Sequence, residues 1–410
     1  MNGTKLYQRI AIVLIVALGL AVAGCNKQAD NGTITPTTTA NTSTTTTTGK
    51  NTTLNYSKNS PLDTSNMFTQ TDLTQTVDTT NAKKITLEDG KDVTIDAAGT
   101  YVITGTAKNS TVIVNASADA EVHLVFDNVS ITNTNKPTVY AVNAKNVYVT
   151  TTQNSTNNLK VTGEFTEDDG NDINAVIFAK TNITLNGLGT LNIDSSANGI
   201  ASNSDLKITG GIYNVNTIKH GFKALNSIRV ADGTFNINAT KDGFHSENED
   251  DLTTGYVYIA GGNFTINSED DGIQGTSITE IDGGTFAINA VEGIEGTYVQ
   301  INDGTIKIYA TDDGINASEK ATNYDVQIEI NGGNLDITMA EGDTDALDAN
   351  GTLTINGGYI NITAQFAFDF DLTASLNGGT VIVNGTQVTS ITNSMMEGGG
   401  GPGGFGGPQH

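Results

Sequence analysis

Two series of mostly polar side chains accompany a short phrase, an acidic residue followed by glycine and an aliphatic residue, that recurs in the second half of the chain. The first series, called the first column, stands directly before the glycine: Asn198, His220, Asp242, Asp271, Glu292, Asp313 and, where Ala346 replaces glycine, Asp345. The second column stands two residues after it: Ala201, Lys223, His245, Gln274, Glu295, Asn316, Asp348 and, in a last copy without glycine, Asp369. Copies lie about 20 to 30 residues apart, which is typical of a solenoid. We therefore expect each series to form a row of neighbouring side chains.

The acidic members of these columns predict a calcium site. Stacked strands lie ~4.8 Å apart, so carboxylates on adjacent coils repel one another unless a cation lies between them. Calcium binds oxygen at about 2.3 to 2.6 Å, and oxygen ligands without His or Cys clusters favour calcium over zinc or copper. The candidate ligands are Asp242, Asp270, Asp271, Glu292, Glu295, Asp312 and Asp313, with a second group at Asp343, Asp345 and Asp348. The alternative is a solvated acidic ridge that limits lateral aggregation.

A basic patch interrupts the acidic columns. Lys219 and Lys241 occupy the same phase in adjacent copies of the phrase, as do Lys223 and His245, and His220 lies between them. Such a cluster is suited to recognising a carboxylate or sulfate group on a substrate. The alternative is that the lysines compensate the neighbouring acids.

Short strands joined at glycine turns must position these side chains. Triplets such as Leu206-Lys207-Ile208 and Val257-Tyr258-Ile259 alternate apolar and polar residues, and each is followed by glycine and a Phe-x-Ile type strand. The pattern predicts an all-β fold, a right-handed parallel β-helix, with less regular N-terminal coils or a cap. The recurring aromatic position is expected to lie in the core rather than to form a sugar platform: Tyr213, Phe235, Phe264 and Phe286.

The ends of the chain predict its location. Lys5 and Arg9 precede an apolar run at residues 10–23, which has the form of a secretory signal. Val22-Ala23-Gly24-Cys25 matches a bacterial lipobox, and Cys25 is the sole cysteine, so we expect its lipidation and no disulfide framework. We expect residues 1–24 to be the signal peptide, 25–60 a disordered tether rich in Thr, Asn and Ser, 61–392 the β-helix, and 393–410 a Gly-rich disordered tail.

The charge balance narrows the range of partners. Asp and Glu number 45 against 20 Lys and Arg, a formal net charge of −25, which argues against nucleic acid as a partner. An acidic polysaccharide would also be repelled, unless bound calcium bridges its uronate carboxylates. The chain has no Trp, which argues against an aromatic platform for crystalline cellulose.

Over about residues 85–392 the chain resembles bacterial carbohydrate-binding-domain surface proteins that have a calcium-binding, polysaccharide-lyase-like parallel β-helix. The segments that carry the resemblance are Ala175-Val176-Ile177-Phe178-Ala179-Lys180, Ile183-Thr184-Leu185-Asn186-Gly187, Gly189-Thr190-Leu191, the serial Gly-Gly phrases, Asp271-Gly272-Ile273 and Asp313-Gly314-Ile315. The resemblance implies a cell-surface protein that holds cellulose or pectin-like polysaccharide without cleaving it, with calcium at the acidic coil positions. Asn198 and His220 early, and Ala346 and Phe366 late, depart from the acidic pattern.

These observations predict a secreted lipoprotein, anchored at the bacterial cell surface through Cys25, that binds polysaccharide with Ca²⁺. The first alternative is a calcium-dependent, pectate-lyase-like enzyme, in which calcium would bind the uronate carboxylate and Lys219, Lys223, Lys241 or Arg229 would act as the base. The second alternative is a structural adhesin. The sequence leaves the oligomeric state open.

Overall fold

In this computed structural model, residues 61–166, 173–342 and 344–394 are described, and they belong to one compact unit. The predicted signal peptide, the predicted tether with Cys25, and Asp343 lie outside the described residues, as does the chain from residue 395. Within the described ranges no helix is long and apolar enough to cross a membrane.

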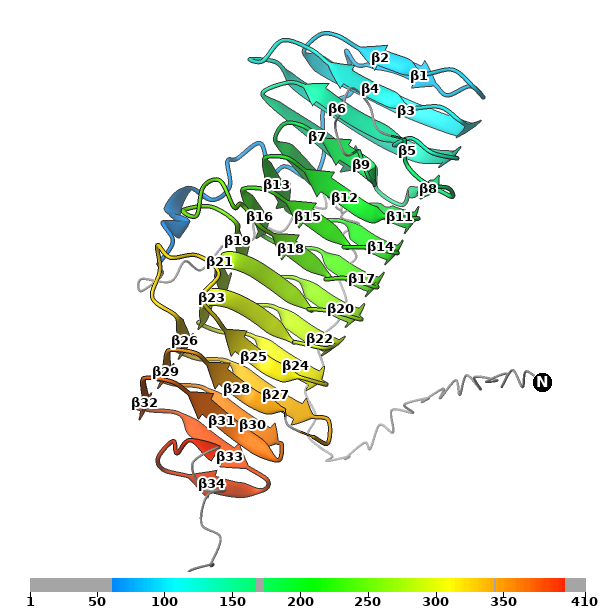
Figure 1. The fold of residues 1–410 in the computed structure, drawn as a ribbon. Helices are drawn as coiled ribbons and strands as arrows, with labels where there is room; N and C mark the ends of the chain where they lie inside the picture. The colour runs from blue at the N-terminus through cyan, green and yellow to red at the C-terminus, as the bar shows by residue number, and fades with distance from the viewer. Residues whose placement is uncertain (1–60, 167–172, 343, 395–410) are drawn as a thin grey trace, which may run out of the picture. The chain divides into compact units, whose positions relative to one another are not determined.

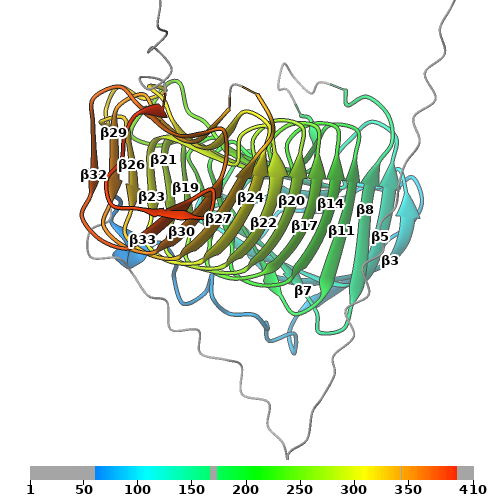
Figure 2. The ribbon, with the colours of Figure 1, turned by 90° about the horizontal axis from the view of Figure 1, so that it is seen from below.

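The strands form three parallel stacks that run along the axis of a β-helix, as the sequence predicted (Figure 1). Figure 2 shows the first stack as a row of neighbouring strands. The first stack holds β8 (Thr156–Val161), β11 (Thr190–Ser195), β14 (Ile212–Thr217), β17 (Thr234–Ala239), β20 (Asn263–Ser268), β22 (Thr285–Ala290), β24 (Thr305–Ala310), β27 (Asn334–Met339), β30 (Tyr359–Thr363) and β33 (Thr380–Val383).

The second stack follows the turn at the end of each first-stack strand. It holds β2 (Val93–Ile95), β4 (Val112–Asn115), β6 (Val139–Asn143), β9 (Ala175–Ala179), β12 (Asn198–Ser202), β15 (Phe222–Ala224), β18 (Phe244–Ser246), the first halves of β21 (Ile273–Ile281) and β23 (Ile294–Ile301), β25 (Asp313–Ala317), β28 (Asp345–Ala349) and β31 (Phe366–Phe370).

The third stack completes each coil. It holds β1 (Lys83–Thr86), β3 (Gly99–Lys108), β5 (Glu121–Asn133), β7 (Asn146–Thr151), β10 (Ile183–Gly187), β13 (Asp205–Ile208), β16 (Ser227–Val230), β19 (Tyr256–Ile259), the second halves of β21 and β23, β26 (Gln327–Ile330), β29 (Thr352–Ile355) and β32 (Thr373–Leu376). The long strands β3 and β5 pass a bulge and continue toward the first stack, which makes the N-terminal coils irregular, as expected.

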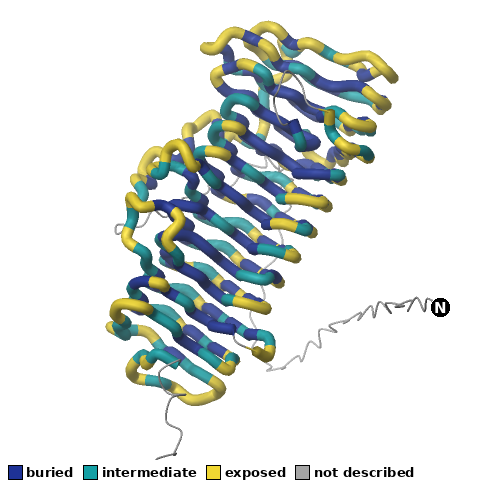
Figure 3. The backbone as a smooth tube through the Cα atoms, in the orientation of Figure 1, coloured by how far each residue is buried: buried dark blue, intermediate teal, exposed yellow. Residues whose placement is uncertain are grey.

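Alternation of apolar and polar residues fills the core. Inward residues of all three stacks are buried, whereas exposed residues gather at turns and on outer strand positions (Figure 3). Tyr213, Phe235, Phe264 and Phe286 are at most 3% exposed and stack ring on ring, with centroids 5.2, 4.7 and 4.4 Å apart. The aromatic series is therefore core, as the sequence predicted.

Glycine serves two different purposes in each coil. At the turn before the first stack, Gly233 and Gly262 adopt φ of 148° and 121°, which favours glycine. In the acidic–Gly phrase the reason is instead close packing of coils, since a Cβ on Gly293 would lie 2.3 Å from the carbonyl oxygen of Gly314. Glycine at that position lets the columns stack.

Residues 61–78 form a segment, here called the strap, that lies against the third stack (blue in Figure 1). It contains the 3-10 helix η1 (Thr64–Asn66). Asp72 accepts a hydrogen bond from Thr184 Oγ1 at 2.9 Å and pairs with Lys207 Nζ at 2.8 Å. Met67 and Phe68 pack on Tyr258.

At the C-terminal end of the β-helix, β34 (Thr386–Val388) pairs antiparallel with β33 and ends the first stack.

Candidate functional site

Both predicted columns lie in or beside the second stack. The register of the strands joins the members of the second column in the order expected from the sequence: Ala201, Lys223, His245, Gln274, Glu295, Asn316, Asp348, Asp369. Each member therefore lies one strand spacing, ~4.8 Å, from the next along the axis.

Side chains of the first column also bind the backbone of the adjacent coil. Asp242 Oδ1 accepts the Asp271 N–H at 3.2 Å, and Asp313 Oδ1 accepts the Asp345 N–H at 3.3 Å. His220 N–H is bound in the same way by Asn198 Oδ1 at 3.1 Å. One carboxylate oxygen of Asp242 and of Asp313 is thus used to join the coils.

Asp271, Glu292 and Glu295, here called the carboxylate cluster, each bring an oxygen to within 4.8 Å of the others. Asp271 and Glu295 are buried, with 6% and 3% exposed. Burial, followed by the charges of Asp242 and Glu295, raises the pKa of Asp271. Burial and Glu295 likewise raise the pKa of Glu292. Holding Asp271 and Glu292 ionised at neutral pH therefore requires positive charge nearby.

Polar groups already compensate part of this charge. Lys320 Nζ lies 2.8 Å from Glu295 Oε1, and Gln274 Nε2 donates to Asp271 Oδ2 at 2.9 Å and to Glu295. Asn316 Nδ2 donates to Glu292 Oε2 at 3.0 Å, while the buried Asn316 Oδ1 has no hydrogen-bond partner among the described residues. Three carboxylates and a spare amide oxygen fit the donor set of a hard cation such as calcium.

The second predicted group is less tightly gathered. Burial and Asp348 raise the pKa of Asp313 to about 8, and burial and Asp369 raise the pKa of Asp348 to about 6. Among the described residues, Asp345 and Asp348 join no set of three ligand atoms within 4.8 Å, and the same holds for Asp313 and the exposed Asp312, which were predicted in the first group. Asp343 lies outside the described residues. Asp270 does join such a set, with Asp242 and Asp271.

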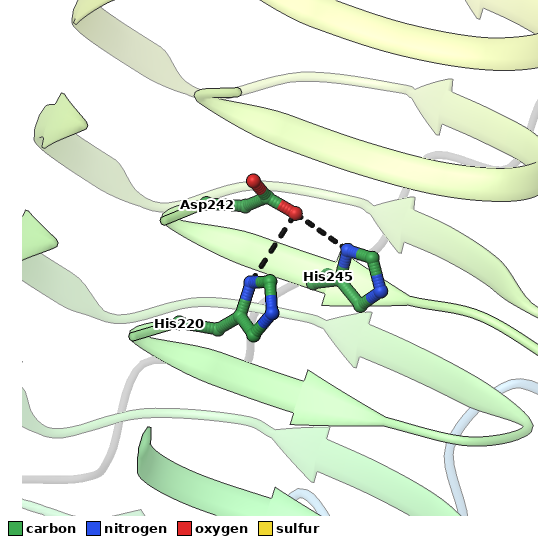
Figure 4. A group of neighbouring side chains, drawn as sticks. All are labelled: His220, Asp242 and His245. Atoms are coloured by element: carbon green, nitrogen blue, oxygen red, sulfur yellow. Dashed lines mark hydrogen bonds and ion pairs between the residues drawn. The ribbon is translucent and has the colours of Figure 1, made fainter. Parts of the chain in front are cut away.

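His220, Asp242 and His245 converge at the next coils toward the N-terminus (Figure 4). Asp242 Oδ2 lies 3.3 Å from His220 Nδ1 and 2.5 Å from His245 Nδ1, and the two imidazole rings stack with centroids 4.3 Å apart. The sequence placed His220 and His245 in one basic patch, but not as a pair that shares the Asp242 carboxylate. His220 and His245 belong to different columns and adjacent coils, so their contact becomes visible only when the coils are stacked.

The three groups titrate differently. Burial lowers the pKa of His220. Burial opposes protonation of His245 too, but its hydrogen bonds to Asp242 and Glu247 outweigh this effect and raise its pKa. For Asp242, burial opposes ionisation, yet the hydrogen bonds from His220 and His245 hold its pKa well below the usual range. The arrangement thus keeps Asp242 ionised.

The candidate basic residues do not form one catalytic group. Lys241 Nζ pairs with Asp270 at 2.6 Å, and this contact raises the Lys241 pKa, the opposite of what a base requires. Lys219 is exposed and Lys223 is partly buried beside His245. Arg229 lies on the third stack, where it pairs with Asp205 at 2.8 Å and donates to Met67 O in the strap. The strap therefore covers Arg229 on the outer face of the third stack.

A groove of about 420 Å³ crosses the ends of the first-stack strands β11, β14, β17 and β20, directly before the turns that carry Lys219 and Lys241. A ladder of exposed side-chain amides follows it: Asn238 Nδ2 donates to Asn216 Oδ1 at 2.9 Å, and Asn267 Nδ2 donates to Asn238 Oδ1 at 3.1 Å. The register extends this row through Asn289 to Tyr309, whose side chain is 44% exposed. This row was not predicted from the sequence, although an Asn three residues after each core aromatic was the available signal.

A protein family, a curated protein and a solved structure are similar to this chain. A family model described as "Carbohydrate-binding domain-containing protein" matches residues 89–297 and 289–394. A curated protein of the same description from Acetivibrio thermocellus is 34% identical over 124 residues, or 30% of this chain and 43% of that protein, so the chain spans less than half of the curated relative it matches. A solved structure described as a polysaccharide lyase-like protein from C. thermocellum, in a gadolinium derivative, is 25% identical with a TM-score of 0.45, and the match covers 64% of this chain and 98% of that one.

Proposed function

Because this chain belongs to the family of carbohydrate-binding domain-containing proteins, we propose that it binds polysaccharide without cleaving it, in the amide-lined groove of the first stack, and that calcium bound by the adjacent carboxylates supports this binding. The single observation that carries the proposal is the row from Asn216 to Tyr309, which lies along the axis and ends beside the acidic turns.

The chemistry of the row suits a sugar chain. Each side-chain amide can both donate and accept hydrogen bonds, as pyranose hydroxyls require. The ladder bonds fix the amide orientations, so little side-chain entropy remains to be lost on binding. Tyr309 adds an exposed ring on which a sugar face can pack.

For calcium, the carboxylate cluster and Asn316 Oδ1 are the proposed ligands. Bound calcium would neutralise the cluster and could also bridge a uronate carboxylate on the glycan. Because its ligands come from successive coils, the ion would couple to folding. The same acidic edge would repel a sulfated glycan that calcium does not bridge to the protein. We therefore expect cellulose or pectin-like chains to bind in preference to such glycans.

The proposed location is the bacterial cell surface, with the lipid on Cys25 as the anchor and the segment to residue 60 as a tether. Mass spectrometry of the membrane fraction should find a lipid-modified N-terminal Cys25, and Cys25→Ala should release the protein into the medium. Equal membrane retention of both forms would contradict the anchor.

The binding test uses the purified chain with cellulose and with polygalacturonate, each in calcium or in chelator. We expect co-sedimentation that Asn238→Ala and Tyr309→Ala weaken by about tenfold each, the equivalent of ~1.4 kcal/mol. Tyr359→Ala is the matched control, because Tyr359 is equally exposed, at 46%, but starts β30 in a different row.

The same samples distinguish the alternatives. Absorbance of unsaturated product would establish a lyase and contradict the non-catalytic proposal. Product lost in Lys219→Ala or Lys223→Ala would locate the base there. The absence of both retention and product would favour the structural adhesin.

A further inference from the structure

We propose that His220, Asp242 and His245 form a second cation site, for a borderline transition metal ion of the Zn²⁺ class, distinct from the oxygen-lined carboxylate cluster (Figure 4). The three ligand atoms are His220 Nδ1, His245 Nδ1 and Asp242 Oδ2. They come from two adjacent coils: His220 lies in the turn before β15, and Asp242 and His245 lie in the turn before β18 and in β18 itself.

The spacing of these atoms is close to that of a tetrahedral site. Zinc bonds of about 2.0 to 2.2 Å place tetrahedral ligand atoms about 3.3 to 3.6 Å apart. His220 Nδ1 and Asp242 Oδ2 are already 3.3 Å apart. His245 Nδ1 and Asp242 Oδ2, at 2.5 Å, share a hydrogen bond, and a metal that replaced the proton would require a small outward movement of one ring.

A supporting contact of the kind that accompanies metal-binding histidines is present. Ligating histidines almost always donate their other ring N–H to a carboxylate, carbonyl or water, which fixes the tautomer. His245 Nε2 lies 3.1 Å from Glu247 Oε2, so Nδ1 is the nitrogen left for a metal. Asp242 is fixed as well, because its Oδ1 accepts the Asp271 N–H.

The donor types separate this site from calcium. Two imidazole nitrogens and one carboxylate are the protein ligands of many zinc sites, whereas calcium takes oxygen ligands. The Asp242 side chain is 3% exposed and the His220 side chain 15%, so the site is closed toward the core and reachable by water on the His220 side. A metal here would join two coils at the point where the acidic column gives way to Asn and His.

The test is calorimetric titration of the chelator-stripped full chain with Zn²⁺, with calcium in excess, and a parallel titration with Co²⁺ that records its visible absorption. We expect one equivalent of Zn²⁺ and the intense Co²⁺ bands of a tetrahedral site. His220→Gln and Asp242→Asn should abolish both signals, and Glu247→Gln should weaken Zn²⁺ binding by about 10- to 100-fold.

Two controls use the remaining histidines of the four in the sequence. His123→Gln, in β5, and His410→Gln, outside the described residues, should leave Zn²⁺ binding unchanged. Circular dichroism checks that each variant folds. If His220→Gln does not fold, the milder Glu247→Gln substitution still tests the proposal. Three results would overturn the proposal. They are unchanged Zn²⁺ binding in both Glu247→Gln and His220→Gln, loss of Zn²⁺ binding in His410→Gln, and complete block of Zn²⁺ binding by calcium.

Discussion

At the scale of single residues, the buried carboxylates connect stability to pH and to calcium. Asp271, Glu292 and Asp313 have folded pKa values above their ordinary ones, so the folded state binds protons more tightly than the unfolded state. Without metal, the stability that Glu292 and Asp313 contribute at low pH is lost as pH rises from about 4 through their folded pKa values of about 7 and about 8, and the raised pKa of Asp271 extends the loss to higher pH. Thermal midpoints in chelator should fall over this window, and calcium should reduce the fall. Identical curves in calcium and chelator would favour the solvated acidic ridge.

One substitution separates the charge of Asp271 from its shape. Asp271→Asn resembles the protonated form that burial favours and keeps an oxygen acceptor for Gln274. We therefore expect a thermal midpoint in chelator no lower than that of the wild type, but loss of most of the calcium-induced stabilisation. Asp303→Asn, in an exposed turn before the first stack, is the control and should keep the full calcium response. A normal calcium response in Asp271→Asn would remove this cluster from the site.

Some of the side chains in the candidate site could be predicted from the sequence, and others could not. The second column was predictable because a fixed offset from glycine becomes strand register once coils stack, and at Gly293 the close approach of the next coil leaves no room for a Cβ. The sequence brought His220 and His245 together in the basic patch, but it did not predict that both contact Asp242, since this contact joins the first column of one coil to both columns of the next. Nor was the cover over Arg229 predictable, because it comes from the strap, which is far away in sequence.

At the scale of elements, the strap fastens the third stack across several coils. Asp72 is 1% exposed and binds Lys207 and Thr184, which lie on β13 and β10. Asp72→Ala would leave Lys207 without its partner, so we expect destabilisation of roughly 3 kcal/mol, seen as a lower thermal midpoint and faster proteolysis of the strap. Asp78→Ala, at an exposed strap position, is the control and should change neither. Equal behaviour of the two variants would mean that the strap contributes little to stability.

At the scale of the whole molecule, each coil contacts mainly its neighbours, so the effect of a ligand should decline with distance along the axis. Calcium at the carboxylate cluster should most strongly slow hydrogen exchange of the Gly272 and Gly293 amides, which bind the carbonyls of Glu292 and Asp313 on the next coils. Protection should be weaker at β15 and β28 and absent at β3 and β33. Asp271→Asn should remove the pattern, whereas uniform protection from β3 to β33 would show that calcium acts on the solenoid as one cooperative unit rather than through neighbouring coils.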